Sequence, residues 1–176
     1  FDNDGFLDIL IFHGGLIHMV PQEQSLFRGM GNGKFVDAAR AAGPVLDVKT
    51  VSRGACFADY DNDGKMDAFV VNLGSAATLV HNVSTGTGHW IAFQLHGHKS
   101  NRDGIGTRIE VFTGTRKQIA ERVAGSGYLS QDDARVHFGD AWAVGQTLRV
   151  RPQHGQVVVS AHEVLVLGAR EPGFDF

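Results

Sequence analysis

The chain has 176 residues, a formal net charge of −3 and 43% hydrophobic residues. Charges of both signs are interspersed, so no basic footprint for nucleic acid is visible, and no apolar run approaches the ~18 residues of a membrane span. The lone Cys56 permits no internal disulfide, and an inert core thiol is its simplest interpretation.

The chain opens on an acidic loop that recurs about 60 residues later, a spacing typical of a repeated supersecondary unit. The first copy is FDNDGFLD at residues 1–8, and the second is DYDNDGKMD at residues 59–67. In each copy acidic side chains recur at every second position and a glycine allows the bend that folds them inward. The first aspartate of the first copy would lie one place before Phe1, so we interpret the chain as a fragment of a longer protein.

Short apolar runs around these loops predict strands separated by turns. The Asn32-Gly33 pair is a strong hairpin signal, and residues 37–42 predict one helical turn that ends at Gly43-Pro44. Four short strands per ~60 residues, with an acidic turn in each unit, are typical of propeller blades. The expected strands cover residues 7–12, 26–28, 34–36, 55–58, 68–72 and 78–81.

The acidic loops predict calcium sites, because calcium takes ~6–8 oxygen ligands at flexible geometry. An EF-hand is excluded, since its closing glutamate would fall on Val70. The alternative is an Asp/Asn/Gly-rich β-turn that needs no metal. We expect tight occupancy at the second loop and weak or absent metal at the first, which lacks its first position. The expected ligands are Asp59, Asp61, Asp63, Asp67 and the Lys65 carbonyl in the second loop, and Asp2, Asp4, Asp8 and the Phe6 carbonyl in the first.

The motifs LFRGMGNGKFVDAARAAG and FADYDNDGKMDAFVVN resemble the FG-GAP/VCBS repeat of integrin-like β-propellers over residues 1–82. The resemblance implies that the acidic loops bind calcium and that the blades form a protein-interaction scaffold. Only about one and a half blades are present, whereas a propeller needs ~4–8 to close.

Residues 83–88 are polar and predict a linker, after which the pattern is again β. Alternating segments over residues 89–168 predict a small antiparallel sandwich or barrel, and residues 169–176 form a tail. Its expected strands cover residues 89–95, 108–112, 118–123, 135–138, 148–151, 157–159 and 164–167.

The motifs HWIAFQLHGHKSNRDGIGTRIEV and GSGYLSQDDARVHFG resemble the ASPIC/UnbV domain, which follows VCBS-type propellers in the cartilage acidic protein-like family and in bacterial homologues. The match weakens beyond residue 139, where residues 151–155 replace the usual tryptophan-proline-serine-glycine turn. The resemblance implies a secreted, extracellular or bacterial envelope protein, and it carries no catalytic residues.

Catalytic signals are weak in the chain. A nucleophile elbow at Ser126 is excluded, because Ala124 and Tyr128 stand where it needs glycines. His96 and His98 could share a metal with Asp103, but no further ligand spacing supports that site. Six polar residues of the GSGYLSQDDARVHFG segment are candidates for a ligand or partner contact. The alternative is that they satisfy backbone groups of the turn. They are Ser126, Tyr128, Ser130, Gln131, Arg135 and His137.

The function we expect is calcium-stabilised, non-catalytic recognition of an extracellular protein or glycan. The alternative is the C-terminal part of a secreted or biosynthetic-cluster enzyme, a hydrolase, lyase or enediyne-type pathway protein, whose active site lies upstream. Further acidic loops upstream at ~60-residue spacing would favour the scaffold, and a catalytic signature there would favour the enzyme.

Overall fold

A computed structural model describes residues 1–15, 17–85, 88–98, 101–140, 147–151 and 157–162. Over these residues the protein is all-β with small antiparallel sheets, which confirms the predicted fold class. The expected strand at residues 164–167 and the tail at 169–176 lie outside the described residues.

The chain forms two compact units that interleave in sequence. The first unit comprises Phe1–Thr87 together with Ala124–Asp133, and the second comprises Gly88–Val123 together with Ala134–Phe176. Residues 124–133 therefore belong to the first unit, although they lie between two stretches of the second.

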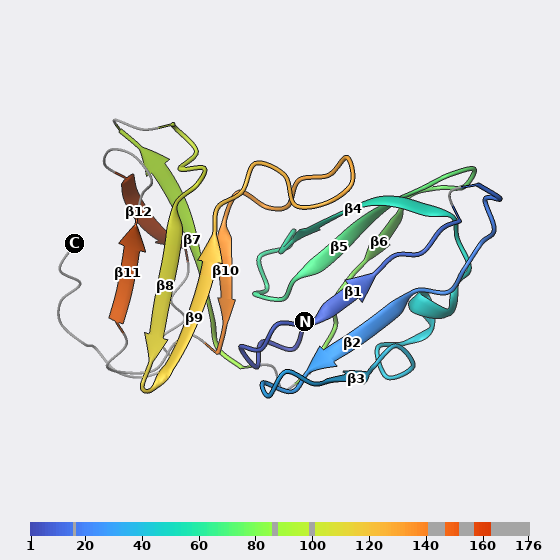
Figure 1. The fold of residues 1–176 in the computed structure, drawn as a ribbon, viewed down its shortest axis with the longest axis horizontal. Coiled ribbons are helices and arrows are strands. Elements are labelled where there is room, and N and C mark those ends of the chain that lie inside the picture. Colours follow the sequence, from blue (N-terminus) through green and yellow to red (C-terminus); the bar gives the residue numbers. More distant parts are fainter. Residues whose placement is uncertain (16, 86–87, 99–100, 141–146, 152–156, 163–176) are drawn as a thin grey trace. The chain divides into compact units, whose positions relative to one another are not determined.

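The first unit contains two three-stranded antiparallel sheets (Figure 1). In both sheets the strands follow one another in chain order, as in a meander. One sheet consists of β1 (Ile9–Ile11), β2 (Ser25–Gly29) and β3 (Phe35–Asp37), and the other of β4 (Ser52–Ala58), β5 (Asp67–Asn72) and β6 (Thr78–Val80).

Strand β5 shows how the sequence pattern determines the faces of its sheet. Ala68 and Val70 are buried, whereas Phe69 and Val71 between and after them are exposed. Successive side chains of a strand point to opposite faces, so one face of the sheet joins the core and the other faces outward. The acidic loop that precedes β5 is thereby attached to a strand with a fixed register.

The structure contains the expected helical turn and also a short 3-10 helix that the sequence did not predict. The amide of Ala42 donates to the carbonyl of Ala38 at 3.0 Å, which closes a turn within the predicted segment. A 3-10 helix then follows at Pro44–Asp47, after the Gly43-Pro44 pair. Proline is favoured at the first position of a helix, so this pair marks a helix start as well as an end.

Residues 124–133 pack against the edge of β4 within the first unit. The Phe57 amide donates to Asp132 Oδ1 at 2.8 Å, and the Phe57 carbonyl accepts from the Asp133 amide at 2.9 Å. These bonds satisfy one residue of an edge strand that would otherwise present unpaired backbone groups.

The second unit is a small sandwich of two antiparallel sheets, in the orders β10-β7-β12 and β11-β8-β9. Side chains of β7, β8 and β10 form its core, with Ile109 fully buried and the rings of Phe93 and Phe138 in edge contact at 5.9 Å. The strands are β7 (Trp90–Gly97), β8 (Arg108–Thr113), β9 (Arg116–Glu121), β10 (Val136–Gly139), β11 (Thr147–Arg151) and β12 (Val157–His162).

Candidate metal centre

The second acidic loop connects β4 to β5 and is bent by two residues in the left-handed region. Asn62 has φ 61° and Gly64 has φ 85°. Asparagine and glycine are the residues that visit this region at least cost. The bend brings the amides of Asp63 and Gly64 to the two oxygens of the Asp59 carboxylate, each at 3.0 Å. The loop is therefore folded around its first aspartate.

Three carboxylates converge at this loop. One oxygen each from Asp59, Asp61 and Asp67 lies within 4.8 Å of the others, with Asp59 and Asp67 buried and Asp61 exposed. Two such charges ~5 Å apart repel by about 3 kcal/mol at an effective dielectric of ~20. A hard divalent cation would remove this repulsion, and the donor set, which consists of oxygens only, suits calcium.

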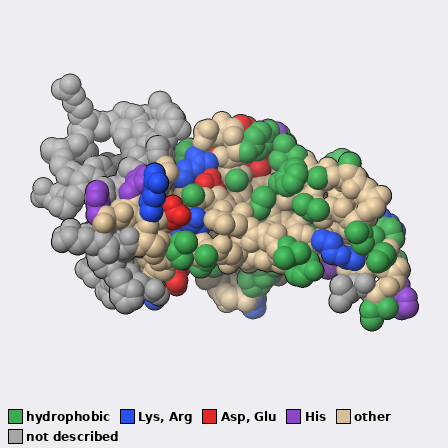
Figure 2. All heavy atoms as spheres, turned by 90° about the horizontal axis from the view of Figure 1, so that it is seen from above, with side chains coloured by type: hydrophobic (Ala, Val, Ile, Leu, Met, Phe, Trp, Pro, Cys, Tyr) green, Lys and Arg blue, Asp and Glu red, His purple; other side chains and the backbone are tan. Residues whose placement is uncertain are grey.

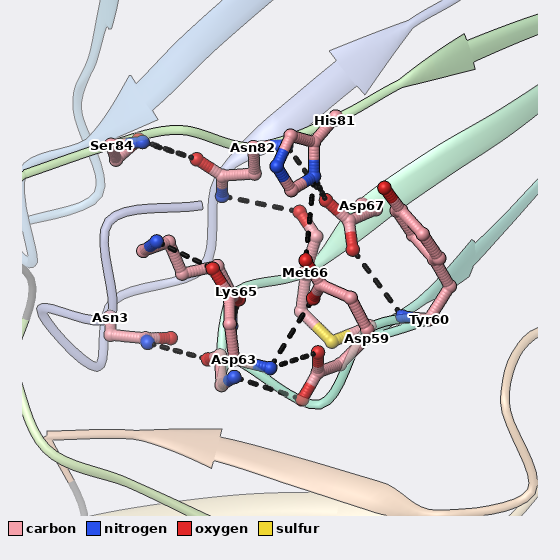
Figure 3. Close-up of polar contacts among 12 residues, drawn as sticks. Asn3, Asp59, Tyr60, Asp63, Lys65, Met66, Asp67, His81, Asn82 and Ser84 are labelled. Atoms are coloured by element: carbon pink, nitrogen blue, oxygen red, sulfur yellow. Dashed lines mark hydrogen bonds and ion pairs between the residues drawn. The ribbon is translucent and has the colours of Figure 1, made fainter.

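Asp67 is held by three neighbouring residues (Figure 3). Its Oδ1 accepts from the Asn82 amide at 2.7 Å and lies 3.2 Å from His81 Nδ1. Its Oδ2 accepts from the Tyr60 amide at 3.3 Å. Tyr60, which precedes β5 in the chain, and His81 and Asn82, which follow β6, thus orient the carboxylate that ends the loop.

Asp63 stands apart from the trio because Lys65 pairs with it. Lys65 Nζ lies 2.6 Å from Asp63 Oδ2, and the Lys65 amide donates to Asp63 Oδ1 at 2.9 Å. Partial burial works against ionisation of Asp63, but these hydrogen bonds outweigh it and hold the pKa of Asp63 below its usual range. The same side-chain hydrogen bond raises the pKa of Lys65. Both residues stay predicted ligands, and Asp63 would have to leave Lys65 to join the trio.

The first acidic loop carries an internal cation. Arg28 Nε lies 2.7 Å from Asp2 Oδ2, and Arg28 Nη2 lies 3.1 Å from Asp4 Oδ2. The charge of Asp2, followed by the hydrogen bond to Asp4, raises the pKa of Arg28. Asp8 accepts from the Gly29 amide at 2.8 Å.

Two asparagines join the acidic loops to each other (Figure 3). Buried Asn3 donates from Nδ2 to the Gly64 carbonyl at 2.8 Å. Asn82 Nδ2 donates to the Phe1 carbonyl at 2.8 Å and to the Met66 carbonyl at 3.2 Å.

The ligands predicted from the sequence did not include the two residues that contact Asp67 from beyond β6, His81 and Asn82. The sequence signal that could have identified them is the similarity of LVHN at residues 79–82 to LFRG at residues 26–29, which occupies the same place in the first repeat.

The predicted partner contact divides between the two units. Ser126, Tyr128, Ser130 and Gln131 belong to the loop of the first unit, whereas Arg135 and His137 belong to the second. Within the second unit the His137 ring stacks on Trp90, with centroids 5.6 Å apart.

Tyr128 and Leu129 expose two large apolar side chains on the loop at residues 124–133. Tyr128 is 65% exposed and Leu129 is 89% exposed. Leu129 also has φ 49°, an uncommon conformation for a leucine.

His96, His98 and Asp103 do not form a metal-ligand group in the part of the chain that the structure describes. Among the same residues, no helix is both long enough and apolar enough to cross a membrane.

The fold and the acidic loops define an all-β repeat protein. The family model for an FG-GAP-like repeat matches residues 1–70, and the model for ASPIC and UnbV matches residues 97–162. The chain therefore carries an FG-GAP-like repeat followed by an ASPIC and UnbV domain, which confirms both resemblances and makes it a repeat module of the extracellular type. A search of the curated proteins found no match to the chain.

Proposed function

We propose that the chain is a calcium-binding, non-catalytic recognition module of a secreted or envelope protein. The convergence of Asp59, Asp61 and Asp67 is the observation that carries the calcium part of this proposal. The FG-GAP-like repeat supports it, because such repeats often bind calcium. The ion would compensate the loop charges and tie β4 to β5.

The donor set fits a structural cation. The backbone amides of Asp63 and Gly64 hold the Asp59 carboxylate, and Asp67 is held by His81 and Asn82, just beyond the end of β6. Oriented carboxylates of this kind lose little freedom when a cation arrives, so less of the binding free energy is spent on ordering them. Asp61 is exposed and completes the trio from the solvent side.

Calcium is expected to raise the melting temperature of the chain. At free calcium of ~100 times Kd, binding adds about 2.7 kcal/mol to stability, which corresponds to several degrees. The measurement is thermal melting in excess calcium and in chelator. Asp61→Asn should remove the difference, because it takes a charge from the trio and leaves the buried Asp59 and Asp67 in place.

Glu23→Gln is the matched control for that experiment. Glu23 is an exposed partner of Lys49 at 3.3 Å, so the variant changes the net charge equally without touching the acidic loops. It should keep the full calcium effect. Identical wild-type curves in calcium and in chelator would refute the calcium proposal.

The recognition part of the proposal rests on the exposed apolar residues of the first unit. Tyr128 and Leu129 stand on its loop, and Phe69 and Val71 lie on the outward face of β5. Figure 2 shows apolar side chains interrupting the polar surface on the face it presents, with Lys and Arg there in separate small groups. An extracellular protein or a glycan suits such a surface better than nucleic acid does.

A protein and glycan array probed with and without calcium tests recognition. We expect a binder whose signal weakens by at least about tenfold in chelator, because bound calcium stabilises the folded first unit. Tyr128→Ser should weaken the same signal. The absence of any binder would refute recognition, and chemical conversion of an arrayed molecule would refute the non-catalytic assignment.

A further inference from the structure

The two acidic loops are built on the same internal hydrogen bonds. The Asp4 amide donates to Asp2 Oδ1 at 3.3 Å, as the Asp63 amide donates to Asp61 Oδ1 at 3.3 Å. The amide two residues further on repeats the pattern, at 2.8 Å for residue 6 and 2.9 Å for residue 65. Asp2 and Asp4 therefore correspond to Asp61 and Asp63.

The correspondence extends to a strand that approaches each loop from later in the chain. The Gly29 amide donates to Asp8 Oδ1 at 2.8 Å, and the Asn82 amide donates to Asp67 Oδ1 at 2.7 Å. Gly29 ends β2, and Asn82 lies two residues beyond the end of β6. The residue just before each of these amides therefore occupies an equivalent place facing the acidic loop.

That place holds Arg28 in the first repeat and His81 in the second. Arg28 directs two nitrogens of its guanidinium at two carboxylates, at 2.7 Å from Asp2 and 3.1 Å from Asp4. His81 directs one ring nitrogen at the closing aspartate, at 3.2 Å from Asp67, and lies 3.9 Å from Asp61.

We propose that the residue at this place sets how readily an acidic loop takes a divalent cation. Arg28 serves as a built-in cation of the first loop, whereas His81 leaves Asp61 and Asp67 of the second loop without such a fork, and Lys65 pairs with Asp63 outside that trio. The part of this inference that concerns His81 and the second loop rests on the proposed function, and the part that concerns Arg28 does not. A guanidinium is always charged, and its planar fork matches carboxylate oxygens. Calcium would have to displace it from Asp2 and Asp4. An imidazole has no such fork, and His81 directs only Nδ1 at the carboxylates of Asp67 and Asp61.

The test exchanges the two residues and counts bound calcium by isothermal titration of the whole chain. Wild type should bind one calcium ion per chain, at the second loop. His81→Arg should weaken that binding by at least about tenfold, because it introduces a fork beside Asp61 and Asp67. His81→Gln should bind within about threefold of wild type, since it adds no charge.

The reverse exchange concerns the first loop. Arg28→Gln should bind a second calcium ion, more weakly than the second loop binds its own because the first loop lacks a counterpart of Asp59, whereas Arg28→Lys should still bind one ion, because it keeps the positive charge. Lys49→Gln is the matched control: it removes one positive charge from an exposed pair with Glu23 and should leave the count unchanged. Circular dichroism of each variant checks that the sheets are formed.

The outcomes separate this inference from the calcium proposal. A wild-type chain that binds two calcium ions, an Arg28→Gln chain that gains none, or a His81→Arg chain that binds as tightly as wild type each overturns the inference. A wild-type chain that binds no calcium refutes the proposed function instead. In that case a calcium ion gained by Arg28→Gln would still support the role of Arg28.

Discussion

Replacing Asp67 with alanine is expected to lower the free energy of unfolding by about 2 kcal/mol in chelator, because the lost hydrogen bonds outweigh the repulsion that the lost charge relieves. The carboxylate is 3% exposed and accepts from the amides of Tyr60 and Asn82, with His81 beside it. Alanine removes the acceptor and leaves these donors without it in a largely dry site. Loss of a charged acceptor costs more than loss of a neutral one.

Urea unfolding followed by circular dichroism measures this loss. Asp61→Ala is the matched control, because Asp61 is exposed and the hydrogen bond it accepts from the Asp63 amide is long at 3.3 Å. That variant should cost less than about 0.5 kcal/mol in chelator, because the lost contact is weak and the lost charge relieves repulsion within the trio. Asp67→Asn should fall between the two, since its amide keeps one acceptor oxygen. Equal losses for the two alanine variants would show that Asp67 has no structural role apart from the cation.

Replacing Ile109 with alanine is expected to cost the second unit about 4 kcal/mol. Ile109 is 0% exposed and lies in the cluster that both sheets of the sandwich share, together with Phe93, Val111 and Phe138. Alanine removes three carbons from a close-packed site. The loss therefore combines lost transfer free energy with the free energy of a cavity whose walls relax only in part.

The measurement is urea unfolding followed by the fluorescence of tryptophan, since Trp90 begins β7 of the same unit. Ile119→Ala is the control, because Ile119 lies on the neighbouring strand β9 of the same sheet and is 47% exposed. It should cost less than about 1 kcal/mol. A small loss at Ile109 would contradict the assignment of the core to this side of β8.

The strands could be predicted because their signal is local. In β5 apolar side chains alternate between the buried and exposed faces, and the expected strand at residues 68–72 differs from Asp67–Asn72 by one residue. The acidic loop was equally visible, because its Asp spacing and its left-handed Asn62 and Gly64 lie within nine consecutive positions. Both signals act over a few residues, where backbone geometry leaves few options.

The 3-10 turn at Pro44–Asp47 shows where local signals compete. Gly43 favours the end of one turn, while Pro44 also favours the start of another. The sequence pattern supports both interpretations at once. Packing decides between them: Leu46 is buried, and its carbonyl accepts from the Gln24 amide at 2.8 Å.

The repeat, the acidic loops and the identity of their carboxylates can be read from the sequence alone. The residues that face each loop depend on the fold: Arg28 lies beside Asp2, and His81 and Asn82 lie beside Asp67. It also brought Asn3 to the carbonyl of Gly64, across 61 positions of the chain. The physical reason is register. Which residue faces a loop depends on how strands pair at a distance, and a shift of one position would turn a different side chain toward the carboxylates.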